Sequence, residues 1–140
     1  MVAIAGMGGE TIAAILEQAP WTRENTLLLL QPMTSFPDLR QWLVENGYRV
    51  EHETLCQEGS RMYTVLTVRG GQDVPMTPAE LWVGRNTPQP LRGAYLSMME
   101  GKVRRALDGQ KASANPDRAV VEQLEQVLAG MVEMKKELEA

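Results

Sequence analysis

An apolar strand that leads straight into a glycine-rich turn opens the sequence, and this feature limits the possible folds more than any other. Residues 2–5 are a short apolar run, and three glycines follow within residues 6–9. Residues 11–18 then carry apolar side chains at the helical spacing of three and four. A second apolar run at 26–31 and a second helical pattern at 35–47 repeat this order. Strands that alternate with helices of this length predict crossover connections and a parallel sheet.

Two further strands follow without a helix between them. Residues 49–56 alternate between apolar and polar side chains, whereas residues 62–68 are apolar on both faces. This contrast predicts a hairpin whose second strand lies inside the sheet and whose first strand lies at its edge. On that edge strand the alternation places Cys56 in the core and Glu53 on the exposed side.

The last part of the chain changes from strands to helices. Residues 71–90 are rich in Gly and Pro and predict a linker, with at most a short turn at 80–83. Two long helical patterns fill residues 91–140, which we expect to form an antiparallel, coiled-coil-like hairpin. The seam of its second helix steps by four and three through Val120, Leu124, Val127, Met131, Met134 and Leu138.

Composition excludes several classes of function. One Cys and one His among 140 residues can form neither an internal disulfide nor a Cys/His zinc site, so we expect no bound metal. A net charge of −4 argues against a uniformly basic nucleic-acid binder. The longest apolar run, residues 27–30, is too short to span a bilayer, and no targeting segment is visible. We therefore expect a cytoplasmic protein without a membrane partner.

Two candidate sites lie at the carboxyl ends of the predicted parallel strands, where ligands bind in open sheets of this kind. The first is the turn at residues 6–9, which matches neither a Walker loop nor the GxGxxG pattern. The second is Gln31-Pro32-Met33. The alternative interpretations stay open: a tight turn without a ligand, and a polar strand end closed by proline.

A third candidate is a group of basic residues near the first long helix, with only Glu100 and Asp108 as acids in the same stretch. Such a group could contact phosphates, or it could be an ordinary solvated helix face. Its members are Arg92, Lys102, Arg104, Arg105 and Lys111.

Three collinear motifs carry a resemblance to a known family. Residues 4–10 read IAGMGGE, residues 28–33 read LLLQPM, and residues 39–48 read LRQWLVENGY. These segments resemble the bacterial tRNA (adenine-22-N1)-methyltransferase family, the TrmK family, over about residues 2–68. Thr64 departs from the pattern, which has an acid at that position.

The resemblance implies an α/β fold: the C-terminal half of a class I (Rossmann-like) methyltransferase sheet, followed by the helical hairpin. A complete sheet of this class has the strand order 3-2-1-4-5-7-6, and this chain would hold strands 4-5-7-6. Residues 1–70 would be this partial domain, 71–90 the linker and 91–140 the hairpin. The implied activity is methyl transfer from S-adenosylmethionine to N1 of an adenine in tRNA, in which N1 attacks the methyl group directly.

The resemblance also implies roles for individual residues. Gly6, Met7, Gly8 and Gly9 would hold the target base, and Ala5 and Gly6 would border the methyl donor. Gln31, Pro32 and Met33 would wall the substrate pocket, and the five basic residues would contact the tRNA backbone.

The donor-binding motifs of this family lie before the segment present here. We therefore expect the chain to be a fragment that is inactive alone, whose first strand has an open edge prone to pairing with another chain. A non-catalytic interaction module and another class I RNA methyltransferase remain alternatives. The oligomeric state and the target nucleotide stay open.

Overall fold

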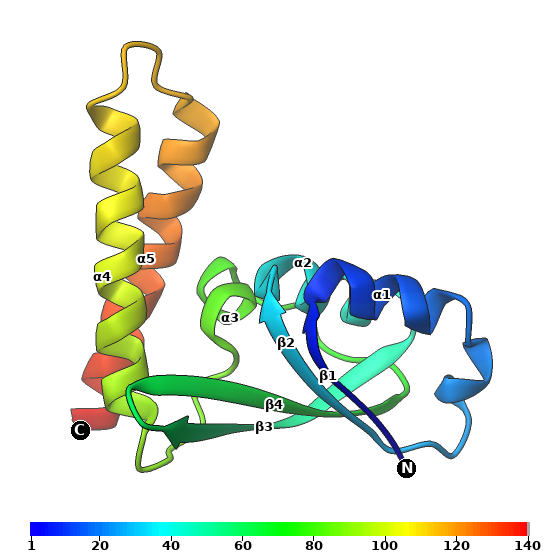
Figure 1. The fold of residues 1–140 in the computed structure, drawn as a ribbon. Helices are drawn as coiled ribbons and strands as arrows, with labels where there is room; N and C mark the ends of the chain where they lie inside the picture. Colours follow the sequence, from blue (N-terminus) through cyan, green and yellow to red (C-terminus); the bar gives the residue numbers. More distant parts are fainter. Residues whose placement is uncertain (140) are drawn as a thin grey trace. The chain divides into compact units, whose positions relative to one another are not determined.

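The computed structural model describes residues 1–139, which divide into two compact units (Figure 1). The first, Met1–Met76, is called the sheet unit below, and the second, which starts at Thr77, is called the hairpin unit. No helix within residues 1–139 is long and apolar enough to cross a membrane.

The sheet unit contains a four-stranded mixed sheet with the order β1-β2-β4-β3. β1 and β2 are parallel, whereas β4 is antiparallel to both of its neighbours. The apolar strand of the predicted hairpin therefore lies inside the sheet and the alternating strand at its edge, as expected. The elements are β1 (Val2–Gly8), α1 (Gly9–Glu17), the 3-10 helix η1 (Pro20–Arg23), β2 (Leu28–Thr34), α2 (Phe36–Glu45), β3 (Tyr48–Glu58) and β4 (Arg61–Gly70).

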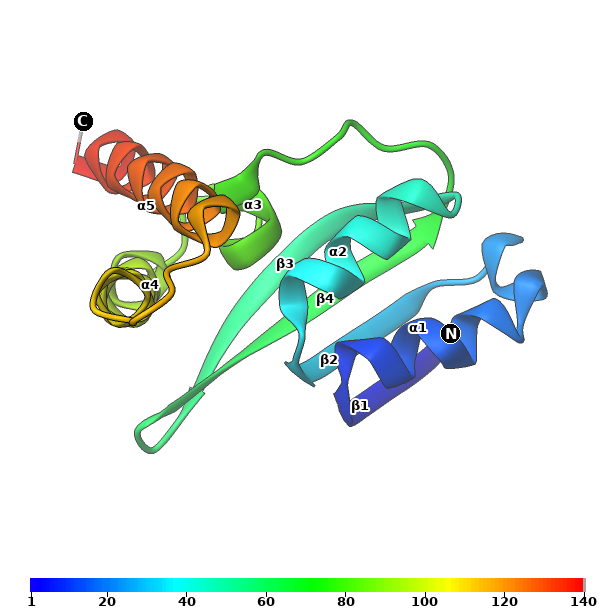
Figure 2. The same ribbon diagram turned by 90° about the horizontal axis from the view of Figure 1, so that it is seen from above.

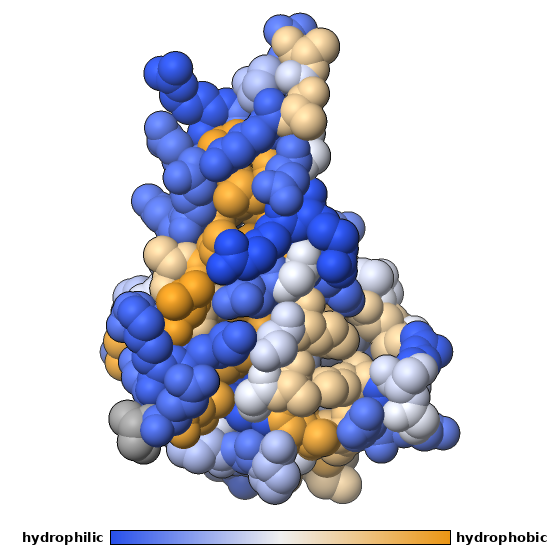
Figure 3. Space-filling model, turned by 90° about the vertical axis from the view of Figure 1, so that its left-hand side faces the viewer, coloured by the Kyte–Doolittle hydropathy of each residue, from blue (hydrophilic) through white to orange (hydrophobic). Residues whose placement is uncertain are grey.

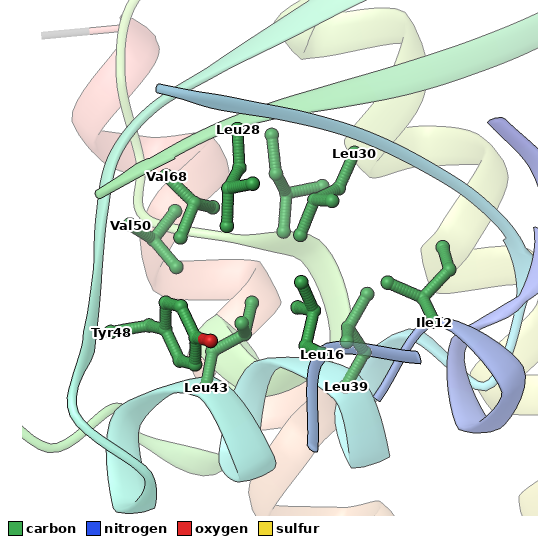
Figure 4. Packing of buried hydrophobic residues seen from close by; sticks show 10 residues of the cluster. Ile12, Leu16, Leu28, Leu30, Leu39, Leu43, Tyr48, Val50 and Val68 are labelled. Carbon is green, nitrogen blue, oxygen red and sulfur yellow. The ribbon is translucent and has the colours of Figure 1, made fainter. Parts of the chain in front are cut away.

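Both α-helices of the sheet unit lie on the same face of the sheet (Figure 2). Their apolar residues pack on the strands to form one buried cluster (Figure 4). On the opposite face, Ala3 and Ala5 of β1 are exposed. Parallel strands are normally covered on both faces. Within the sheet unit, helices cover one face of the sheet and leave the other face uncovered. The cluster consists of Ile12, Leu16, Leu28, Leu30, Leu39, Leu43, Tyr48, Val50, Leu66 and Val68.

The edge strand β3 departs from the alternation that its sequence predicts. A bulge shifts its register against β4 between Val50 and His52, which exchanges the two faces for the rest of the strand. Leu55 is therefore buried, whereas Cys56 is exposed. Glu53 points to the helix-covered face and forms an ion pair with Arg40. The expected places of Cys56 and Glu53 were wrong for this reason.

The hairpin unit contains α3 (Pro78–Val83), α4 (Arg92–Lys111) and α5 (Arg118–Glu139). α4 and α5 run antiparallel and pack along their length (Figure 1). Leu124, Val127, Met131 and Met134 of the predicted seam are buried.

Within the stretch expected to be a linker, α3 forms because Thr77 caps it. The Thr77 hydroxyl accepts a hydrogen bond from the Glu80 amide, and the Glu80 carboxylate accepts one from the Thr77 amide. This capping box, with Pro78 in the first turn, was present in the sequence as a Thr-Pro-x-Glu signal. α3 packs against α5, where a Cβ on Gly130 would lie 2.5 Å from the Cβ of Ala79.

Candidate functional site

The structure brings the first two candidate segments side by side. In the parallel ladder Ala5 pairs with Gln31, Met7 with Pro32 and Gly8 with Thr34. The register shifts between Ala5 and Met7, so Gly6 has no counterpart on β2. The glycine-rich turn and the Gln-Pro-Met segment thus form one continuous surface at the carboxyl end of two parallel strands.

The glycines of the turn differ in how much space surrounds their Cβ positions. A Cβ on Gly9 would lie 2.5 Å from the carbonyl oxygen of Ser35, so the packing of the two helix starts requires glycine there. A Cβ on Gly8 would lie 2.8 Å from Oγ1 of Thr34. Gly6 has a φ of +74° and no atom within 4 Å of its Cβ position. A tight turn explains Gly8 and Gly9, whereas Gly6 leaves open space beside the main chain.

The two candidate segments also expose large apolar side chains. Met7 is 40% exposed and Met33 is 37% exposed, whereas Pro32 is buried and Gln31 is half-buried. Exposed large apolar side chains beside a main chain that no Cβ covers are typical of a surface that receives a ligand or another chain.

The start of α2 is held in place by a buried ion pair that the sequence did not reveal. Ser35, with a φ of +57°, turns the chain from β2 into α2. Arg40 has a fully buried side chain, and its Nη2 and Nε donate hydrogen bonds to Glu53 at 2.7 and 3.1 Å. Its guanidinium group also lies 5.5 Å from the ring centroid of Phe36, at the first turn of α2. A charged residue directly after the apolar Leu39 on the core-facing side of α2 was the available signal.

The basic residues of α4 do not form a single patch. At 100° per residue, Lys102 and Arg105 lie on one side of the helix, and Arg104 and Lys111 lie on nearly the opposite side. All four are exposed. A polyanion on one side of α4 would therefore meet two of these cations.

Arg92, which was expected to contact the tRNA backbone, is buried and only 3% exposed, so it cannot make that contact. Its Nη1 donates to the carbonyl oxygen of Val83 at 2.6 Å, and its Nη2 donates to that of Gly84 at 2.9 Å. Its Nε donates to Oδ1 of Asn86 at 3.1 Å, and the amide of Asn86 donates to the main chain of Met134. Arg92 therefore ties the end of α3 to α4 and α5. Carbonyls at the C-terminal end of α3 supply these acceptors, which a count of charges along the sequence does not show.

The site has no metal-binding arrangement in the part of the chain that the structure describes: residues 1–139 contain no cluster of three or more His, Cys, Asp or Glu side chains that could hold an ion. Near the turn, Ser35 Oγ donates a long hydrogen bond of 3.4 Å to Glu10. What the surface offers chemically is thus main-chain groups, one amide side chain and thioethers.

Comparisons with known proteins agree with this architecture. A curated relative, the tRNA (adenine(22)-N(1))-methyltransferase of Bacillus subtilis, is 35% identical over 71 residues, which cover 50% of this chain and 30% of that protein. A crystal structure of a protein in the NADB-Rossmann superfamily from Streptococcus agalactiae has a TM-score of 0.74 and 27% identity, and the match covers 95% of this chain and 58% of that one.

A third comparison carries a ligand. Sp1610 of Streptococcus pneumoniae, a putative tRNA (m1A22) methyltransferase crystallised in complex with S-adenosyl-L-methionine, matches with a TM-score of 0.66 and 28% identity. The match covers 91% of this chain and 59% of that one. The chain thus spans less than two thirds of the length of these relatives.

The family model for tRNA (adenine(22)-N(1))-methyltransferase matches residues 1–133, nearly the whole chain. Because this match covers nearly the whole chain, the chain belongs to the TrmK family.

Proposed function

We propose that this chain supplies the target-base side and the RNA-binding hairpin of a tRNA (adenine-22-N1)-methyltransferase that uses S-adenosylmethionine. The observation that carries the proposal is the surface at the carboxyl ends of β1 and β2, where Gly6, with open space at its Cβ position, lies between the ladder partners of Gln31 and Pro32. Family membership supplies the reaction, and the surface supplies a place for the base.

The residues of this chain would act by positioning. Methylation at N1 needs the N1 lone pair to stay free, so protein contacts must fall on other atoms of the base. Main-chain carbonyls at residues 5–7 could accept from the exocyclic amino group, and the Gln31 amide could bind a ring nitrogen. The thioethers of Met7 and Met33 provide an apolar, polarisable surface for the flat ring. Positioning of this kind accounts for a large share of the rate enhancement in reactions that need no protein nucleophile.

The methyl donor fits only in part. S-adenosylmethionine, when bound, supplies an electrophilic methyl group. Ala5 and Gly6 are exposed and can form one wall of its site. Glu10, the carboxylate nearest the turn in the sequence, accepts a long hydrogen bond from Ser35 on an exposed surface. These residues border a donor site without completing one.

A complementary half of the sheet would complete it. β1 has β2 as its one strand neighbour in the described chain, and the face opposite α1 and α2 has no helix of the sheet unit on it. Both features support the proposal that another α/β segment covers these surfaces. The chain would then be inactive alone and active once strands equivalent to 3-2-1 pair with β1.

The experiment compares three samples on a tRNA with adenine at position 22: this chain alone, a segment of the B. subtilis relative with strands equivalent to 3-2-1, and both joined in one polypeptide. Mass spectrometry of nuclease digests measures N1-methyladenosine. We expect product from the joined protein only, and none with guanine at position 22. Product from the 140-residue chain alone would refute the fragment interpretation, and product at another nucleotide would refute the assigned substrate.

A variant tests the proposed surface. Gly6→Val in the joined protein places a branched side chain in the open space and should lower methyl transfer at least tenfold. Gly59→Val is the matched control, because Gly59 also has a positive φ and open space but lies in the β3–β4 turn, outside the two candidate segments. Equal losses in both variants would show that strain, rather than the site, causes the effect.

A further inference from the structure

A groove runs between α4 and α5 on one side of the hairpin. Its floor is apolar, with Leu107, Leu128 and Val132, and Figure 3 shows apolar residues following the hairpin between charged ones. Its two rims carry opposite charges. Arg104 and Lys111 stand on the α4 rim, and Glu125 and Glu133 stand on the α5 rim.

The charge of the groove argues against RNA as its occupant. Asp108 also lines it, so three carboxylates face any ligand against two cations. The side chains of Arg104 and Glu133 are 54% and 68% exposed, and each forms an exposed ion pair on its own helix, Arg104 with Glu100 and Glu133 with Lys136. A surface with a basic rim, an apolar floor and an acidic rim fits a partner with the same three stripes in the reverse order.

Opposite charges lie at matching heights along the hairpin. Lys135 Nζ lies 3.8 Å from Glu100 Oε2, which fixes how the antiparallel helices face each other. One turn further along α4, Arg104 therefore lies within about a turn of Glu133, and Lys111 lies within about a turn of Glu125.

We propose that two copies of this chain associate groove to groove through a twofold axis parallel to the hairpin. This rotation places α4 of each copy over α5 of its partner at the same height. Arg104 then meets Glu133 of the second copy and Lys111 meets Glu125 of the second copy, twice each, around the apolar floor. An axis perpendicular to the hairpin would instead place α4 over α4 and bring like charges together.

In this dimer the basic residues on α4 have two different roles. Arg104 and Lys111 serve the contact between copies, and Lys102 and Arg105, on the opposite side of the helix, remain accessible. The proposal stands independently of the methyltransferase assignment, because it rests on the shape and charge of the groove alone.

Complementary charge reversal tests the pairing. Variant A carries R104E and K111E, variant B carries E125K and E133K, and variant C carries all four changes. Sedimentation velocity over a range of concentrations measures the mass, with reductant present because Cys56 is exposed. We expect the wild-type chain and variant C to approach twice the monomer mass of 15.6 kDa. Variants A and B should stay monomeric separately, and their equimolar mixture should associate as the wild type does.

The control variant carries K102E and R105E and should associate like the wild type. Far-ultraviolet circular dichroism confirms the helical content of each variant, and variant C keeps the test valid if A or B unfolds. A wild-type chain that stays monomeric, or variants A and B that dimerise as it does, would overturn the proposal. So would a monomeric chain in which variant A alone loses tRNA binding, since the groove would then bind RNA.

Discussion

Removal of one member of the Arg40–Glu53 pair should destabilise the sheet unit severely. Arg40 is fully buried and Glu53 is 12% exposed, so Glu53→Gln leaves a guanidinium charge in the core without its counter-ion. Breaking a buried pair in this way costs about 3–5 kcal/mol. Small domains have about 5–15 kcal/mol of stability in total. The variant should therefore unfold at a much lower urea concentration.

The measurement follows tryptophan fluorescence during urea unfolding. Trp42 stacks on Tyr48 with ring centroids 5.7 Å apart and reports on the sheet unit, and Trp82→Phe removes the reporter on α3. The double variant Arg40→Met with Glu53→Met should recover most of the loss, because it removes both charges. A loss below about 1 kcal/mol for Glu53→Gln, typical of exposed pairs, would refute the reasoning.

Further expectations concern packing and RNA binding. Gly9→Ala should lower the free energy of unfolding by about 1–3 kcal/mol, because its Cβ clashes with the start of α2. Gly109→Ala, in open space on α4, should raise the free energy of unfolding by about 1 kcal/mol. Urea midpoints measure both changes, and the opposite order would contradict the assigned contacts. Arg92→Met should cost about 1–3 kcal/mol for each loop carbonyl left without a donor, and a thermal melt that matches the wild type would show that the hydrogen bonds to α3 contribute little. In the complete protein, Lys102→Glu with Arg105→Glu should flatten the dependence of log tRNA affinity on log salt by about 1.4–1.8 if both contact phosphates, and an unchanged slope would exclude them.

Sequence periodicity predicted the elements well where one face of a segment packs against the core. The alternation of strands with helices gave the parallel pair, and the contrast between residues 49–56 and 62–68 gave the hairpin with its inner and outer strands. These predictions held because burial on one face or two leaves different repeats in a sequence.

The errors arose where a single residue changed a repeat or a distant group supplied a partner. The bulge after Val50 could not be read from composition, and it exchanged the places of Leu55 and Cys56. The sequence places Arg92 among the exposed cations, because its acceptors are carbonyls at the end of α3, eight or nine residues away. At the candidate site, the sequence predicted the glycine turn and the Gln-Pro-Met segment, but only the contacts in the folded chain distinguish the open Gly6 from the packed Gly9.

The bulge in β3 also limits how this strand can change in length. Before the bulge, even-numbered residues such as Val50 face inward, and after it odd-numbered residues such as Glu53 and Leu55 do. Deletion of the bulge residue Glu51 would restore a regular ladder in which Glu53 and Leu55 still face inward, whereas deletion of Thr54, after the bulge, would turn Leu55 out into solvent. Insertions or deletions in relatives of this chain are therefore expected at this strand in steps that preserve its phase, or in the β3–β4 turn, where the phase does not matter.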